Sequence, residues 1–120
     1  MTLSTCCYRL WRPDLGVPVR TSVGPPRSFP DVLVEWETVY PAWALVRGNL
    51  DQPTYRRHYR HQLHRLTPKI LAELQELQEG YCAPLILLCF EDLSKPDVWC
   101  HRTMLAEWIN QKTGEDVPER

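Results

Sequence analysis

Residues 84–90 (PLILLCF) form the longest apolar run in the chain. A nearly continuous apolar run of this length, without polar alternation, is typical of a strand buried on both faces in the middle of an α/β sheet. The run is far too short to span a bilayer. We therefore predict an α/β fold: a single compact domain with a small, open, mainly parallel sheet flanked by helices.

A helix is predicted to follow this strand after a connecting loop, running from about Cys100 to Lys112 and ending at Gly114. In open α/β sheets, ligands bind outside the carboxyl ends of the strands. A helix N-terminus at that edge offers free N–H groups and a partial positive charge. We therefore expect any active or binding site to lie where the apolar strand ends and this helix begins.

Two further helices are predicted upstream of the apolar strand. Asp51 is a suitable N-cap, and Pro53 fits the first turn of a helix over residues 54–66. Pro68 repeats this start signal for a helix over residues 69–79. In each helix the tyrosines, leucines and isoleucines fall on one face, as expected for helices packed against a sheet.

The N-terminal half is rich in proline and is predicted to hold turns and short extended segments. Residues 17–23 (VPVRTSV) alternate and favour a strand, as do residues 43–46 (WALV). Residues 32–36 fit either a strand or an irregular turn. Residues 1–16 are assigned to an N-terminal extension, and the acidic residues 115–120 to a loose tail.

The composition fits one domain. The chain has 120 residues, of which 43% are hydrophobic and 24% charged, so a single core is expected. Its formal net charge of −1 gives no overall field that would attract nucleic acid or an acidic membrane. No phosphate-binding or dinucleotide-binding glycine motif is found, and no cofactor is predicted.

Cysteine usage indicates a reducing compartment. The number of cysteines is odd and their spacing shows no repeated framework: Cys6, Cys7, Cys82, Cys89 and Cys100. Residues 1–7 are too short and too polar for the apolar region of a secretory signal. We predict reduced thiols and a cytoplasmic protein without a membrane partner.

The first candidate site combines Cys89 and Glu91, at the strand end, with Cys100, His101 and Arg102, at the helix start. A cysteine at a helix N-terminus has a lowered pKa, and a neighbouring histidine and arginine lower it further. Arg102 suits a bidentate contact with phosphate or carboxylate. In the alternative, Cys89 is a small core residue and the Cys-His-Arg unit is structural or faces solvent.

Cys89, Cys100 and His101 also carry ligand atoms that suit zinc. No CxxC or HxxxH pair accompanies them, however. Consecutive residues such as Cys100 and His101 are expected to point in different directions on a helix. No metal site is therefore assigned, and zinc binding by these three residues stays a third alternative that metal analysis of the purified protein would test.

Arg20 and Arg27 flank the glycine–proline turn that ends the predicted N-terminal strand. If that strand is parallel to the apolar strand, the turn lies at the same sheet edge as Cys89. Arg20, Arg27 and Arg102 would then converge on one anion. In the alternative, Arg20 and Arg27 are surface residues of a loop.

The predicted helix over residues 54–66 carries a basic face. On a helical wheel, Arg57, Arg60, His61 and His64 lie opposite the tyrosine–leucine face. Such a face suits contacts with nucleic-acid phosphates. In the alternative it is a solvated face, and the acidic side chains of the next helix neutralise it.

The C-terminal motifs resemble a known family. The segments LLCFE (residues 87–91), CHR (100–102) and LAEW (105–108) resemble the signature of the family called domain of unknown function 488. TSVGPPR (21–27) and TGEDVPE (113–119) resemble a short branch of that family. The resemblance implies a small intracellular α/β protein but no reaction. It also implies that these residues form one site: Cys89, Glu91, Cys100, His101 and Arg102, with Arg20 and Arg27 as companions.

The leading hypothesis is an anion-binding site for a nucleotide, nucleic acid or other phosphorylated ligand. Cys100 would be the nucleophile, His101 its partner or a general acid, and Glu91 a base or orienting group. The rival is a non-enzymatic binding module in which the Cys-His-Arg unit is structural. In that module Arg102 pairs with Glu91 or Glu107, and the basic helix contacts a nucleic acid or protein partner.

Overall fold

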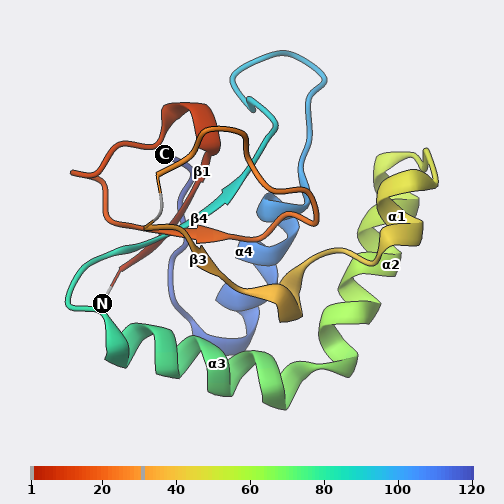
Figure 1. Cartoon of the computed structure of the whole chain (residues 1–120). Coiled ribbons are helices and arrows are strands. Elements are labelled where there is room, and N and C mark those ends of the chain that lie inside the picture. Colours follow the sequence, from red (N-terminus) through yellow and green to blue (C-terminus); the bar gives the residue numbers. More distant parts are fainter. Residues whose placement is uncertain (1, 31) are drawn as a thin grey trace.

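A computed structural model of the chain, which describes residues 2–30 and 32–120, has one four-stranded sheet at its centre (Figure 1). All neighbouring strands are parallel, in the order β1-β4-β2-β3. The strands are β1 (Leu3–Cys7), β2 (Val17–Arg20), β3 (Val34–Glu35) and β4 (Leu85–Cys89). The predicted α/β fold with a small parallel sheet flanked by helices is confirmed.

The apolar run forms β4, which lies between β1 and β2. Its side chains alternate between two clusters. Leu85 and Leu87 belong to the main core, whereas Ile86 and Leu88 belong to a smaller cluster on the other face. None of these four side chains is exposed, which explains why the strand shows no polar alternation.

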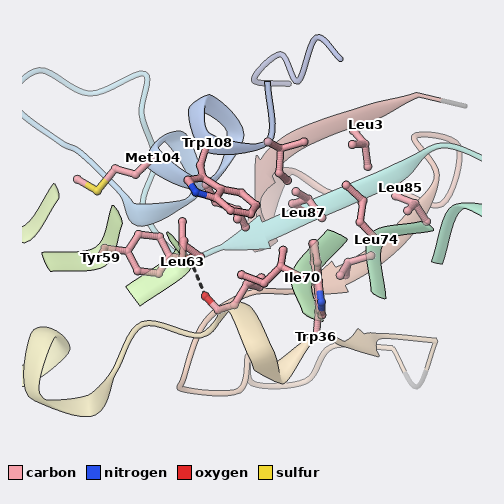
Figure 2. Packing of buried hydrophobic residues seen from close by; sticks show 14 of the residues in the cluster. Leu3, Trp36, Tyr59, Leu63, Ile70, Leu74, Leu85, Leu87, Met104 and Trp108 are labelled. Atoms are coloured by element: carbon pink, nitrogen blue, oxygen red, sulfur yellow. Dashed lines mark hydrogen bonds between the residues drawn. The ribbon is translucent and has the colours of Figure 1, made fainter. Parts of the chain in front are cut away.

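Four α-helices follow or interrupt the strands: α1 (Trp43–Arg47), α2 (Gln52–Arg65), α3 (Thr67–Gly80) and α4 (His101–Thr113). Two short 3-10 turns cover Tyr8–Leu10 and Glu37–Val39. Figure 2 shows how Leu63 of α2, Ile70 and Leu74 of α3 and Trp108 of α4 gather with Leu87 in the main core. The helices thus pack on one face of the sheet.

The opposite face is covered by side chains from loops rather than helices. Trp11, Leu15, Phe29 and Leu33 pack against the smaller cluster around Ile86 and Leu88. Over residues 2–30 and 32–120, no helix has both the length and the apolar character needed to cross a membrane.

The helix boundaries follow local signals. The Asp51 carboxylate accepts a hydrogen bond of 3.0 Å from the Thr54 N–H at the start of α2. Gly114 ends α4 with a φ of +79°, a left-handed conformation that glycine adopts without strain. The predicted helices over residues 54–66 and 69–79 are therefore confirmed within a few residues.

The predicted strand over residues 43–46 is wrong, because these residues form α1. A run of four apolar residues does not distinguish a strand from a helical turn. Alanine and leucine favour a helix here. The Arg47 guanidinium also lies 5.9 Å from the centre of the Trp43 ring, one helical turn away.

The assignment of residues 1–16 to an N-terminal extension missed β1. This strand pairs with β4 in register, from Leu3 beside Leu85 to Cys7 beside Cys89. All five residues of β1 are buried although two of them carry hydroxyl groups. The Thr5 hydroxyl is satisfied by a 2.6 Å hydrogen bond to the Glu119 carboxylate, so a polar segment can lie inside the protein.

The prediction of a loose tail over residues 115–120 is also wrong. The Thr5 N–H donates to the Pro118 carbonyl at 2.8 Å, and the Arg120 N–H donates to the Thr5 carbonyl at 2.6 Å. The tail therefore lies along β1 as a further extended segment, and Glu119 forms a parallel bridge with Thr5.

Candidate cysteine–histidine site

The candidate site lies at the carboxyl ends of β2 and β4, where α4 begins. β2 runs parallel to β4, with Arg20 opposite Leu88, so Thr21 lies beside the end of β4. The Thr21 N–H and hydroxyl both donate to the Leu88 carbonyl, at 3.2 and 2.8 Å. These bonds fix Thr21 at the strand end, next to the first turn of α4.

Cys100 and His101 both face this strand end. Cys100 is the N-cap of α4 and has an extended backbone, with φ −147° and ψ 150°, whereas His101 is the first helical residue. The expectation that the two side chains point in different directions is therefore wrong, since it holds only for two residues inside a helix. His101 Nδ1 lies 3.5 Å from Cys89 Sγ and 3.8 Å from Cys100 Sγ.

The His101 ring is held on its other side by Thr21. Its Nε2 lies 2.9 Å from the Thr21 carbonyl and 3.2 Å from the Thr21 hydroxyl. A carbonyl only accepts hydrogen bonds, so Nε2 carries a proton in this arrangement. The ring packs edge-on against Tyr59, with centroids 5.6 Å apart. Nδ1 is thereby directed at the two sulfurs.

The pKa values of the two thiols are shifted in opposite directions. Burial alone would raise the pKa of Cys100, but hydrogen bonds from Cys89 and His101 and the charge of His101 lower it well below the usual thiol range. The Arg102 backbone N–H at the helix N-terminus also donates to Cys100 Sγ, at 3.5 Å. The bond to Cys100 and burial raise the pKa of Cys89. The N–H groups at the start of α4 therefore favour Cys100 as the thiolate of the pair, with Cys89 as its donor.

Glu91 completes the group. Its Oε2 lies 3.6 Å from Cys89 Sγ. Burial, followed by the negative charge of Cys100, raises the pKa of the Glu91 carboxyl above its usual value. A carboxylate with a raised pKa accepts a proton more readily than an ordinary one.

A pocket of about 500 Å³ opens onto these side chains. Trp43 and Phe90 remain 55% and 50% exposed at its wall. The lining includes Ser22, Trp43, Tyr55, Phe90 and Trp99, together with Cys89, Glu91, Cys100 and His101. Within the described parts of the chain, this lining contains no lysine or arginine.

Arg102 is placed away from the pocket. Its side chain is fully buried, and it donates to the Glu119 carboxylate from Nε at 3.0 Å and from Nη2 at 2.7 Å. The rival hypothesis expected a pair with Glu91 or Glu107. Glu107 instead pairs with Arg56.

Arg20 and Arg27 also have separate surroundings. Arg20 donates to Glu35 at 2.8 Å and to the carbonyls of Ser22 and Val23. Arg27 is exposed and lines a different groove beside Phe29. The structure therefore does not bring the three arginines together at the pocket, and anion binding by them stays a prediction without support from their contacts.

The basic face of α2 lies on the surface, as predicted. Arg57, Arg60, His61 and His64 line a shallow groove of about 390 Å³ with Trp108 and Lys112 of α4. The acidic side chains of α3 do not line this groove. Glu73 and Glu76 line another one, where Glu73 accepts from the Trp36 indole N–H at 3.0 Å.

Sequence reasoning missed Thr21 and the aromatic wall of Trp43, Tyr55 and Trp99. Thr21 could have been found once the strand order was known, because it follows β2 at the edge where β4 ends. The aromatic residues come from α1, α2 and the loop before α4, and no local spacing joins them.

No protein-family model, curated protein or solved structure matches this chain. The resemblance to the domain of unknown function 488 family therefore stays a prediction.

Proposed function

We propose that this protein is a thiol-dependent enzyme in which Cys100 attacks an electrophilic carbon of a small, neutral, partly aromatic ligand. The main support is the position of His101. Its Nε2 lies 2.9 Å from the Thr21 carbonyl, and its Nδ1 lies 3.8 Å from Cys100 Sγ. This cysteine–histidine pair lies at the wall of an open pocket. A nucleophile and base in contact, with the base oriented by a third group, is the arrangement that nucleophilic catalysis requires.

The ligand class follows from the pocket lining. The walls combine aromatic side chains with aliphatic ones, and Glu91 contributes a carboxylate rather than a cation. A phosphorylated ligand would meet this carboxylate, and no arginine or lysine of the described residues lines the pocket to neutralise it. A flat, uncharged ring stacks on exposed aromatic side chains instead.

The chemistry is illustrated by an ester substrate. Cys100 Sγ forms a bond to the carbonyl carbon, the ester C–O bond breaks, and the alcohol leaves with a proton from His101. Water then attacks the thioester, which releases the carboxylic acid and restores the thiolate. Glu91 takes the proton of that water and His101 regains it, so that one ester and one water give one acid and one alcohol.

Two chromogenic probes test this proposal. Metal-free protein with the exposed Cys82 changed to serine is mixed with para-nitrophenyl acetate or para-nitrophenyl phosphate. We expect nitrophenol release and one acetyl group on Cys100 with the acetate, and no reaction with the phosphate. Reaction that persists in Cys100→Ser, or a preference for the phosphate, would overturn the proposal.

The pocket wall offers a second variant. Trp43→Ala removes an exposed ring from the wall, and we expect it to slow the reaction with the aromatic ester at least about tenfold. Leu10→Ala, which removes an equally exposed apolar side chain outside this pocket, is the matched control. If both variants slowed the reaction equally, the reaction would not depend on the aromatic wall of this pocket.

The proposed chemistry requires reduced sulfur. All five cysteines are free, and the two at the site are buried. We extend the proposal to a reducing compartment, the cytoplasm, where such thiols persist.

The basic groove between α2 and α4 favours a second candidate function, the binding of nucleic acid. Arg57, His61, His64 and Lys112 present positive or titratable groups there, without a described acidic side chain in the lining. A fluorescent oligonucleotide tests this, with Arg57→Ala and Lys112→Ala expected to weaken binding and lower its salt dependence. Binding unchanged by both variants would exclude the groove.

A further inference from the structure

The ligand atoms of Cys89, Cys100 and His101 lie close enough together to share one metal ion. All three lie within 4.8 Å of one another. The two sulfur-to-nitrogen distances are 3.5 and 3.8 Å. Zinc bonds of about 2.3 Å to sulfur and 2.0–2.1 Å to nitrogen at tetrahedral angles require a sulfur–nitrogen edge of about 3.6 Å. Both sulfur–nitrogen pairs already have this spacing.

From this geometry we propose that Cys89, Cys100 and His101 bind a zinc ion, and that the bound metal withdraws both sulfurs from reaction. Metal binding is independent of the proposed function, because it needs only the three ligands. The second part, control of reactivity by the metal, rests on the proposed function of Cys100 as nucleophile.

The surroundings of His101 suit a metal ligand. Nε2 donates to the Thr21 carbonyl at 2.9 Å, so Nδ1 is the ring nitrogen that faces the two sulfurs, and its lone pair is available to a metal that displaces the Nδ1 proton. Metal-bound histidines usually donate their second ring N–H to a carbonyl or carboxylate in this way. The Thr21 hydroxyl, 3.2 Å from Nε2, further restricts the ring. The histidine is therefore oriented for a metal by the sheet edge itself.

The choice of metal follows from the ligands. Two thiolates and one imidazole select zinc over magnesium or calcium, which prefer oxygen. Glu91 lines the same pocket as the three ligands, and its Oε2 lies 3.6 Å from Cys89 Sγ, so its carboxylate is the nearest candidate for the fourth position. A carboxylate or a water is a normal fourth ligand for a site with two cysteines and one histidine.

Cobalt titration tests the binding. Metal-free protein in the Cys82→Ser background is titrated with Co²⁺, which occupies zinc sites and gives a thiolate-to-cobalt charge-transfer band. We expect a band that saturates at one equivalent and disappears when Zn²⁺ is added. The band should be lost in Cys89→Ser and His101→Asn and kept in His64→Asn, a control on the exposed face of α2. Absence of the band in the parent protein would overturn the proposal without depending on any variant.

Iodoacetamide labelling separates this inference from the proposed function. With one equivalent of Zn²⁺, labelling of Cys100 should stop, and EDTA should restore it. Labelling that Zn²⁺ does not slow, despite a cobalt band, would overturn the control of reactivity. A protein that labels readily but gives no cobalt band would refute the metal site and leave the proposed function standing. A cobalt band in a protein whose Cys100 does not label when metal-free would support the metal site and refute the proposed function.

Discussion

Arg102 and Glu119 form a two-bond ion pair that joins the first turn of α4 to the C-terminal tail, with N–O distances of 3.0 and 2.7 Å. The Arg102 side chain is fully buried, whereas 35% of the Glu119 side chain is exposed. Glu119 also accepts from the Thr5 hydroxyl at 2.6 Å, so the same carboxylate connects α4 with β1. Arg102 therefore stabilises the fold next to the site and does not line the pocket.

Glu119→Gln removes the only charge that a described residue places in contact with the Arg102 guanidinium. Loss of one partner of a buried pair costs about 3–5 kcal/mol, and the partial exposure of Glu119 brings the expected loss to about 3 kcal/mol. Urea unfolding measures it. Asp116→Asn, an equal charge change at an exposed position of the same tail, should cost less than about 0.5 kcal/mol. Equal losses would show that the tail is not held by this pair.

Tyr59 and Tyr40 provide a matched pair of hydroxyl deletions. The buried Tyr59 hydroxyl donates to the Val39 carbonyl at 2.6 Å, whereas the buried Tyr40 hydroxyl has no partner among the described residues. Tyr59→Phe should therefore destabilise the protein by about 1–2 kcal/mol, and Tyr40→Phe should be neutral or stabilising. Thermal and urea unfolding compare the two. A larger loss of stability in Tyr40→Phe than in Tyr59→Phe would contradict the hydrogen bond between Tyr59 and the Val39 carbonyl.

Gly16 precedes β2 with a φ of +144°, and a Cβ at this position would lie 2.3 Å from the Pro84 carbonyl oxygen. Gly16→Ala must therefore displace the backbone just before β4, and we expect a loss of at least about 2 kcal/mol. Gly80→Ala, at the end of α3 where a Cβ meets nothing within 4 Å, is the control and should be neutral or slightly stabilising. A tolerated Gly16→Ala would contradict the close approach of these two segments.

His101→Asn tests how the Cys100 thiolate is stabilised. Only the thiolate reacts with iodoacetamide, so the labelling rate rises with pH and levels off above the thiol pKa. The hydrogen bond and charge of His101 lower the pKa of Cys100, so their loss should move the curve to higher pH. An increase of about one unit in the pKa lowers the labelling rate about tenfold at pH values below the pKa. His64→Asn, on the exposed face of α2, should leave the curve in place.

Local patterns in the sequence were sufficient for the central strand and the long helices. Residues 84–90 lack alternation because both faces of β4 are buried, and Asp51 and Gly114 mark helix ends through their own backbone and side-chain chemistry. The position of Cys89 beside the start of α4 also followed from the rule for strand ends in parallel sheets.

The errors concern residues whose environment is set by distant partners. Thr5 belongs to a buried strand because Glu119 and Pro118, far away in sequence, satisfy its polar groups. Arg102 resembles an anion ligand in sequence, yet the tail supplies its anion. The side chains of Cys100 and His101 converge because α4 begins between them, a boundary that sequence signals locate only within a few residues.

Site-resolved labelling of Cys100 in the metal-free, folded protein, followed by mass spectrometry as a function of pH, tests the central claim most directly. We expect the labelling rate to level off at a pH well below the pKa of a simple thiol, which is about 8.5. The reason is that Cys89, His101 and the start of α4 stabilise the Cys100 thiolate. N-acetylcysteine under the same conditions provides the reference curve. A Cys100 curve that coincides with this reference, or a Cys100 that labels only after denaturation, would contradict the account.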